Sequence, residues 1–168
     1  MVSCVENPEI KLSQLEGDSE SLETAYGVTL GFSDFGQSKL LLTAPKLIKI
    51  LSDEEQLIME CPEGLKLIFY DSLNNIESTL IADYGKLFTE KEFLHVKNNV
   101  RFENFNLDTL FAKELDIDFA KDSIYSEKMV IFSNSEGRIS GTKLKANSNF
   151  TFFQLSDISE GHVNFETE

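Results

Sequence analysis

The segment Leu115-Asp116-Ile117-Asp118-Phe119 decides the fold, because apolar and charged residues alternate along it without interruption. Successive side chains of an extended chain point to opposite faces, so Leu115, Ile117 and Phe119 share one face and the aspartates share the other. Such alternation is typical of a half-buried strand in an antiparallel sheet. The same period of two runs through residues 28–32, 64–69 and 99–103.

Short polar segments separate these runs and predict the turns of the sheet. No apolar period suited to a helix of about ten residues interrupts them. The sequence therefore predicts an all-β protein, whose turns lie at Ser33-Asp34-Phe35-Gly36, Ser52-Asp53-Glu54-Glu55, Ser72-Leu73-Asn74-Asn75, Asn98-Asn99 and Ser133-Asn134-Ser135-Glu136-Gly137.

An internal repeat extends the pattern. Residues 78–82 precede residues 100–102, and 30 positions later residues 108–112 precede residues 130–132 in the same way. A longer copy begins at residue 41 and a degenerate copy at residue 139. Each unit reads as a strand that ends in a small residue, then a middle strand, a turn and a closing apolar strand. The small residues would leave room where two sheets come close; they are Ala44, Ala82, Ala112 and Gly141.

Units of this kind cannot bury an apolar face alone, so they must stack on one another. Stacking predicts an open, twisted antiparallel β-jellyroll built from repeated strand-turn-strand units, with an ordinary closed sandwich as the alternative. The jellyroll domain is expected over residues 25–168. Residues 1–24 are polar and acidic and are interpreted as a tether.

Composition excludes several classes of function. The 168 residues include 29 acidic and 15 basic ones, and no basic stripe of the kind that binds nucleic acid is present. No run approaches the ~18–20 apolar residues of a membrane span. There are 14 phenylalanines and no tryptophan, which suits a dry interior.

No pattern for catalysis, a cofactor or a metal is found. His95 and His162 are the only histidines, and neither has a second ligand at metal spacing. A nucleophile elbow, a glycine-rich phosphate loop and a Cys-x-x-Cys motif are absent. Asp116 and Asp118 share one strand face, which is interpreted as solvated. We therefore expect neither an enzyme nor a cofactor.

The two cysteines receive different interpretations. Cys61 lies in a turn-like stretch and reads as a free thiol. Met1-Val2-Ser3-Cys4 reads like the end of a bacterial lipoprotein signal, in which a small residue precedes the acylated cysteine. Cys4 is thus either a lipid anchor or a terminal cysteine without a role.

Several of these segments together resemble the LptC family of lipopolysaccharide export proteins, particularly its Bacteroidetes-type members. The resemblance covers approximately residues 26–166, and it rests on the order and spacing of many weak matches. They are Leu42–Pro45, Gly64–Asp71, Ser78–Tyr84, Asn98–Val100, Ile124–Lys128, Gly137–Gly141 and Gly161–Val163.

The resemblance implies a non-enzymatic periplasmic jellyroll anchored to the inner membrane. Such a protein takes lipopolysaccharide from an inner-membrane ABC transporter and passes it to a periplasmic bridging jellyroll protein. Family members often carry an N-terminal transmembrane helix, which is not seen in this sequence; a lipidated Cys4 would replace it, or the segment has been trimmed. Because the chain is acidic, we expect the groove to hold acyl chains while the phosphorylated headgroup stays in solvent.

Two kinds of site follow from this interpretation. A lipid groove needs inward-facing apolar residues without buried charge. The repeat predicts these in register along one face, although ordinary core residues have the same pattern: Leu42, Leu65, Leu67, Phe69, Ala82, Val100, Phe102, Ala112, Leu115, Ile117, Phe119, Val130 and Phe132.

Unpaired edge strands would form the second kind of site, by adding a partner strand. The first edge, expected to face the transporter, contains Val28, Leu30 and Phe32. The last, expected to face the bridging protein, contains His162, Val163, Asn164 and Phe165.

Two other functions stay open. One is the soluble bridging protein of the same relay. The other is a cell-surface β-sandwich that binds carbohydrate or adheres to a partner, which would show exposed aromatic residues on loops. The placing of phenylalanine within strands and the absence of tryptophan count against the second.

Overall fold

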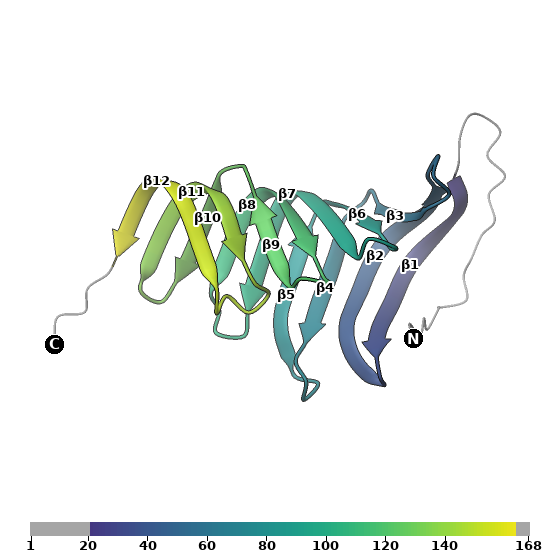
Figure 1. Ribbon diagram of the computed structural model, residues 1–168, viewed down its shortest axis with the longest axis horizontal. Coiled ribbons are helices and arrows are strands. Elements are labelled where there is room, and N and C mark those ends of the chain that lie inside the picture. The colour runs from purple at the N-terminus through teal and green to yellow at the C-terminus, as the bar shows by residue number, and fades with distance from the viewer. Residues whose placement is uncertain (1–20, 164–168) are drawn as a thin grey trace.

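The computed structural model describes residues 21–163, which form twelve antiparallel strands in one twisted, open sheet (Figure 1). The expected all-β fold is confirmed. The strands are β1 (Ser21–Asp34), β2 (Gln37–Leu51), β3 (Leu57–Cys61), β4 (Leu65–Tyr70), β5 (Ile76–Ala82), β6 (Tyr84–Phe88), β7 (Phe93–Asn104), β8 (Thr109–Asp118), β9 (Ser123–Ser126), β10 (Val130–Asn134), β11 (Gly137–Ala146) and β12 (Phe153–Val163).

Long bent strands divide this sheet into two layers that share an apex. The first half of β2 pairs with β4 and its second half pairs with β3. β7, β8 and β11 likewise change partners halfway along their length. Layer A therefore runs β1-β2-β4-β5-β7-β8-β10-β11-β12, and layer B runs β1-β2-β3-β6-β7-β8-β9-β11-β12.

The bends explain one expected turn that the structure does not contain. Asn98 and Asn99 do not end a strand but lie inside β7, with φ of 65° and 50°. The pairing of β7 with β8 shifts between Lys97 and Val100, so the two asparagines form a bulge at which β7 passes from layer B to layer A. Asparagine tolerates the left-handed conformation better than most residues, so it suits this position.

The small residues of the repeat also lie at the bends. Only Ala82 ends its strand; Ala44, Ala112 and Gly141 lie within β2, β8 and β11, so the prediction that each copy's strand stops there is wrong for these three. Each small residue instead pairs with a larger branched one on a neighbouring strand. The pairs are Val28 with Ala44, Leu65 with Ala82, Val100 with Ala112, and Val130 with Gly141.

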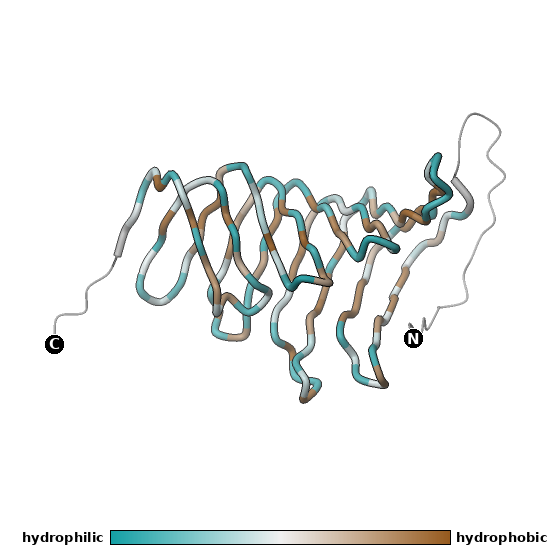
Figure 2. Tube along the Cα trace, viewed as in Figure 1, coloured by the Kyte–Doolittle hydropathy of each residue, from teal (hydrophilic) through white to brown (hydrophobic). Residues whose placement is uncertain are grey.

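The core is an apolar slab between the two layers. Phe102, Leu67 and Leu80 have no measurable exposure in layer A, and Val96 and Leu115 have none in layer B. Figure 2 shows that hydrophobic residues recur along the strands and are not gathered at one end of the molecule. Within residues 23–161, whose side chains are described, no charged residue is buried. The slab is therefore continuous and uncharged from β1 to β12.

Two rows of turns border the side of the molecule opposite the bends, and we call this side the mouth. Row A joins strands of layer A and comprises residues 35–36, 71–75, 105–108 and 135–136. Row B joins strands of layer B and comprises residues 52–56, 89–92, 119–122 and 147–152. In Figure 1 the β2–β3 and β1–β2 turns lie well apart, whereas the β11–β12 loop lies near layer A. The mouth is thus wide at the N-terminal end and narrow at the C-terminal end.

Ser78 is a polar residue that the core does not satisfy. Its side chain is 1% exposed, and its Oγ has no hydrogen-bond partner among the residues that the structure describes. A buried donor without a partner costs the free energy of its desolvation. Replacing Ser78 by alanine is therefore expected to raise the free energy of unfolding by about 1 kcal/mol. Urea unfolding would measure this, with Ser72→Ala in an exposed turn as the neutral control; a loss of stability would contradict the assignment.

Candidate functional site

The residues expected to line a lipid groove all belong to the interior slab or pack against it. Most of them come from layer A. Leu115, Ile117 and Phe119 do not continue that row: they lie in the second half of β8 and at its end, on the layer B side. The rings of Phe119 and Phe69 meet at 6.1 Å between centroids, so the two sets of residues face one another across the slab.

The sequence interpretation missed much of layer B. Its inner face also includes buried residues that were not named as site residues, although Leu94-His95-Val96 alternates as clearly as the strands that were used. The missed residues are Leu47, Met59, Cys61, Leu87, Leu94, Val96, Ile124, Leu144 and Ala146.

The interior is tightly packed. Among the expected groove residues, Leu67, Phe102, Leu115 and Val130 are 0% exposed. Phe102 contacts Phe69 with ring centroids 5.4 Å apart. Proteins pack such interiors to nearly the density of organic crystals, so an acyl chain needs the layers to separate or a side chain to leave.

The two ends of the sheet present edge strands. Within residues 21–163, β1 pairs with β2 alone and β12 with β11 alone. Val28 and Leu30 are 8% and 4% exposed and point into the slab, so their edge offers backbone groups and not these side chains. The backbone of His162 and Val163 belongs to β12 and pairs with β11, whereas their side chains, and all of Asn164 and Phe165, lie outside the described part.

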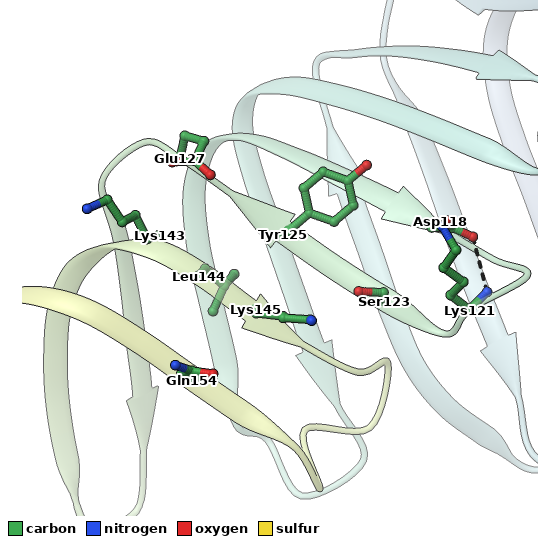
Figure 3. Close-up of a pocket in the computed structure, with 9 residues that line it drawn as sticks. All are labelled: Asp118, Lys121, Ser123, Tyr125, Glu127, Lys143, Leu144, Lys145 and Gln154. Atoms are coloured by element: carbon green, nitrogen blue, oxygen red, sulfur yellow. Dashed lines mark hydrogen bonds and ion pairs between the residues drawn. The ribbon is translucent and has the colours of Figure 1, made fainter.

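A polar hollow of about 510 Å³ lies on the outer face of layer B, near β9, β11 and β12 (Figure 3). Asp118 and Lys121 form an ion pair of 3.1 Å at one end, and Glu127 and Lys143 lie at the other. Lys143 is itself paired with Asp157 at 3.0 Å. With its charges largely compensated, the hollow offers polar contacts but no strong attraction for an ion; Leu144, one of its lining residues, also belongs to the apolar slab.

The outer face also holds the paired aspartates singled out in the sequence. Asp116 Oδ1 lies 2.7 Å from Nδ1 of His95, and Asp118 is paired with Lys121. The hydrogen bonds from Lys121 hold the pKa of Asp118 below its usual value. Among residues 21–163, no group of three or more histidine, cysteine and acidic side chains is placed to hold a metal ion.

Among residues 23–161, three phenylalanines are exposed on loops, contrary to the expectation that phenylalanine stays within strands. Phe35 is 97% exposed in the β1–β2 turn and Phe105 is 66% exposed in the β7–β8 turn. Phe152 is 49% exposed in the β11–β12 loop. These turns belong to the two rows that border the mouth, so apolar surface is concentrated along its rim.

Cys61 of β3 is a buried free thiol in the slab, 2% exposed. Burial, with a smaller contribution from the nearby Glu60 carboxylate, raises the pKa of Cys61 to about 12 from 9.0. Because the thiolate is the reactive form, iodoacetamide is expected to leave Cys61 unmodified at pH 8 until urea unfolds the protein. Mass spectrometry of the Cys4→Ser variant would show this; rapid labelling of the folded protein would contradict it.

The same shift has a consequence for stability at alkaline pH. Between 9.0 and about 12 the folded protein retains the Cys61 proton while the unfolded chain loses it, so stability falls as pH rises through that window. Tyr84 acts in the same direction: burial and its 2.6 Å hydrogen bond to Glu60 raise the pKa of Tyr84 to about 12 from 10.0.

No helix within residues 21–163 is long and apolar enough to cross a membrane. Cys4, the candidate lipid anchor, lies outside the described residues, as does nearly all of the expected tether; β1 already begins at Ser21.

Comparison with known proteins gives one clear result. A search of curated proteins found no match. The family model described as "Lipopolysaccharide-assembly, LptC-related" matches residues 27–163, most of the chain and nearly all of its two-layered sheet. The protein therefore belongs to the LptC-related family, whose members are generally non-catalytic components of lipopolysaccharide assembly and transport.

Proposed function

We propose that this protein is a periplasmic lipopolysaccharide carrier, held at the inner membrane, that takes lipid from an ABC transporter and passes it to a bridging jellyroll protein. The observation that carries the proposal is the slab itself. It is apolar, contains no buried charge within residues 23–161, and runs between two edge strands at opposite ends of the sheet. Each methylene moved into such a slab gains roughly 0.8 kcal/mol.

The ends of the sheet suit a relay. Edge strands present unpaired N–H and C=O groups, which natural proteins cover unless a partner strand is added there. In the proposal β1 receives the transporter, and β12 together with the segment His162–Phe165 receives the bridging protein. Membership of the LptC-related family supports the membrane-side carrier over the soluble bridging protein. Anchoring through Cys4 stays a prediction.

The net charge supports a binding mode in which the acyl chains enter the slab and the phosphorylated headgroup stays in solvent. With a net charge of −14, the protein surface repels phosphate groups, so affinity must come from acyl chains in the slab. The exposed Phe35 and Phe105 at the rim of the mouth would shield those chains as they enter.

The test is photo-crosslinking to purified lipopolysaccharide from positions 69, 117 and 101. Phe69 and Ile117 face the slab from layers A and B, whereas Arg101 adjoins Phe102 but points outward, with its side chain 48% exposed. Crosslinks from Phe69 and Ile117 without one from Arg101 are expected. No crosslink from either interior position would mean that the slab is an ordinary core.

An absence of crosslinks from Phe69 and Ile117 would favour a surface-binding module. The exposed Phe35, Phe105 and Phe152 are the feature that such a module predicts. Replacing all three with serine would then abolish ligand binding, whereas a lipid carrier would keep interior crosslinks.

A further inference from the structure

The loop between β11 and β12, residues 147–152, differs from the other turns of row B, and we call it the strap. It starts and ends in layer B but forms side-chain hydrogen bonds to layer A. Asn149 Nδ2 donates to Glu77 Oε1 at 3.3 Å, and Ser148 Oγ donates to Glu77 Oε2 at 3.3 Å. Asn104 Nδ2 donates to the Asn149 carbonyl oxygen at 3.2 Å. The strap therefore spans the mouth.

Phe150 of the strap fills part of the interior. Its ring lies 5.3 Å from that of Phe102, 5.5 Å from that of Phe132 and 6.3 Å from that of Phe153, measured between centroids. Phe150 has φ of 59°, a conformation that a residue with a side chain adopts at some cost. Contacts with the two layers, and not backbone preference, therefore hold this ring in place.

An unsatisfied polar group lies beside the attachment points of the strap. Ser78 follows Glu77 in β5 and pairs with Asn104 of β7. Its buried hydroxyl has no partner while the strap is closed. An ester or hydroxyl oxygen of an acylated ligand would satisfy it.

The strap is attached in a way that permits it to move. Its three bonds across the mouth are 3.2–3.3 Å long; two of them end on the partly buried Glu77, and the third comes from Asn104, which is 3% exposed. The pairing of β11 with β12 is also irregular farther from the strap, with register shifts on both sides of Thr142, although Lys145–Gln154 and Ala146–Phe153, next to the strap, pair regularly. A segment with few regular backbone bonds opens more readily than the strands beside it.

We propose that the strap is a gate over an acyl-chain subsite at the C-terminal end of the slab. Phe150 occupies the subsite in the closed state. An acyl chain that arrives from the wide N-terminal end displaces this ring by releasing the bonds to Glu77 and Asn104. The inference rests on the proposed carrier function and adds to it the position at which transfer toward β12 is controlled.

Locking the strap tests this directly. Glu77→Cys and Asn149→Cys, in the full chain with Cys4→Ser, are joined across the mouth by a short bis-methanethiosulfonate reagent, which forms a disulfide with each cysteine, replaces the present hydrogen bond and is released by reduction. Photo-crosslinkers are placed separately at Leu42, near the N-terminal edge, and at Phe132, beside Phe150. Purified lipopolysaccharide is the probe. The matched control is Ser140→Cys with Ser159→Cys, whose hydroxyls lie 3.1 Å apart on the neighbouring strands β11 and β12 and do not span the mouth.

The oxidised lock is expected to keep the crosslink from Leu42 and to lower that from Phe132 about tenfold, because the open state is no longer populated. Reduction of the lock should restore the crosslink from Phe132. The control disulfide should leave both crosslinks unchanged. Equal crosslinking from Phe132 in oxidised and reduced protein overturns the gate and leaves the carrier function standing. No crosslink from either position in unlocked protein overturns the carrier function, and the gate with it.

Discussion

Replacing Phe102 by alanine is expected to lower the free energy of unfolding by about 3–5 kcal/mol, which is a large fraction of the stability of a single domain. Phe102 is 0% exposed at the centre of layer A. Its ring touches those of Phe69 at 5.4 Å and Phe150 at 5.3 Å. Truncation therefore removes buried area and leaves a cavity between rings that belong to three different segments.

Urea or thermal unfolding would measure the change, and Phe105→Ala is the matched control. Phe105 is the same residue type three positions along the chain, but it is 66% exposed in a turn. Its truncation should change stability by less than about 0.5 kcal/mol. If the two variants lost equal stability, Phe102 would not be part of a packed core, and the slab would be looser than its burial indicates.

Replacing Gly141 by alanine is expected to cost about 1–3 kcal/mol, although glycine-to-alanine changes in strands usually stabilise. A Cβ at Gly141 would lie 2.7 Å from the carbonyl oxygen of Ser156 and 3.0 Å from Cγ of Leu155. Because the nearer atom is backbone, β11 and β12 must move apart. The loss should therefore be concentrated in the C-terminal edge strand.

Hydrogen exchange would locate the effect: amides of β12 should lose protection while those of β4 and β5 keep it. Gly31→Ala supplies the comparison from the opposite edge. Gly31 lies in β1, and a Cβ there would meet only Leu41 Cδ1 at 4.0 Å, an ordinary contact. Equal and small effects at both glycines would show that β11 and β12 tolerate a wider spacing.

The strand content could be predicted from the sequence because alternation is a local property. Leu115-Asp116-Ile117-Asp118-Phe119 indicates a half-buried strand wherever it lies. The division into two layers was harder to predict, although the sequence contains a signal for it. In β8 the inward positions are Leu110 and Ala112 before the bend and Leu115 and Ile117 after it, so the phase slips by one residue where the strand changes layer.

The same slip occurs in β2 and β11, where Ala44 is followed by Leu47, and Gly141 by Leu144, as the next inward residue. In these three strands the bend places one extra residue between the two faces, so the period of two is broken there. In β7 the bulge at Asn98 and Asn99 places two extra residues between Val96 and Val100, so that strand returns to the same phase. Interpreting the small residues as strand ends missed this slip.

The strap could not be predicted from local pattern. Residues 147–152 carry no strand period, and Phe150 resembles any loop phenylalanine in the sequence. The position of the strap depends on hydrogen bonds to Glu77 and Asn104, which lie 72 and 45 positions from Asn149 in the sequence. Contacts across such separations depend on the bending and stacking of strands that no short window of sequence records.

The pairing of branched with small residues along the apex has a consequence for how such a protein can change in length. From Ala82 to Ala112 the chain makes one full circuit of both layers and adds two strands to each. That circuit starts and finishes at an alanine in the same position of the bend. A duplicated circuit of 30 residues would thus meet the same neighbours as the original. The fold can grow or shrink in whole circuits, so the distance between its two edge strands is adjustable in fixed steps without redesigning its interior.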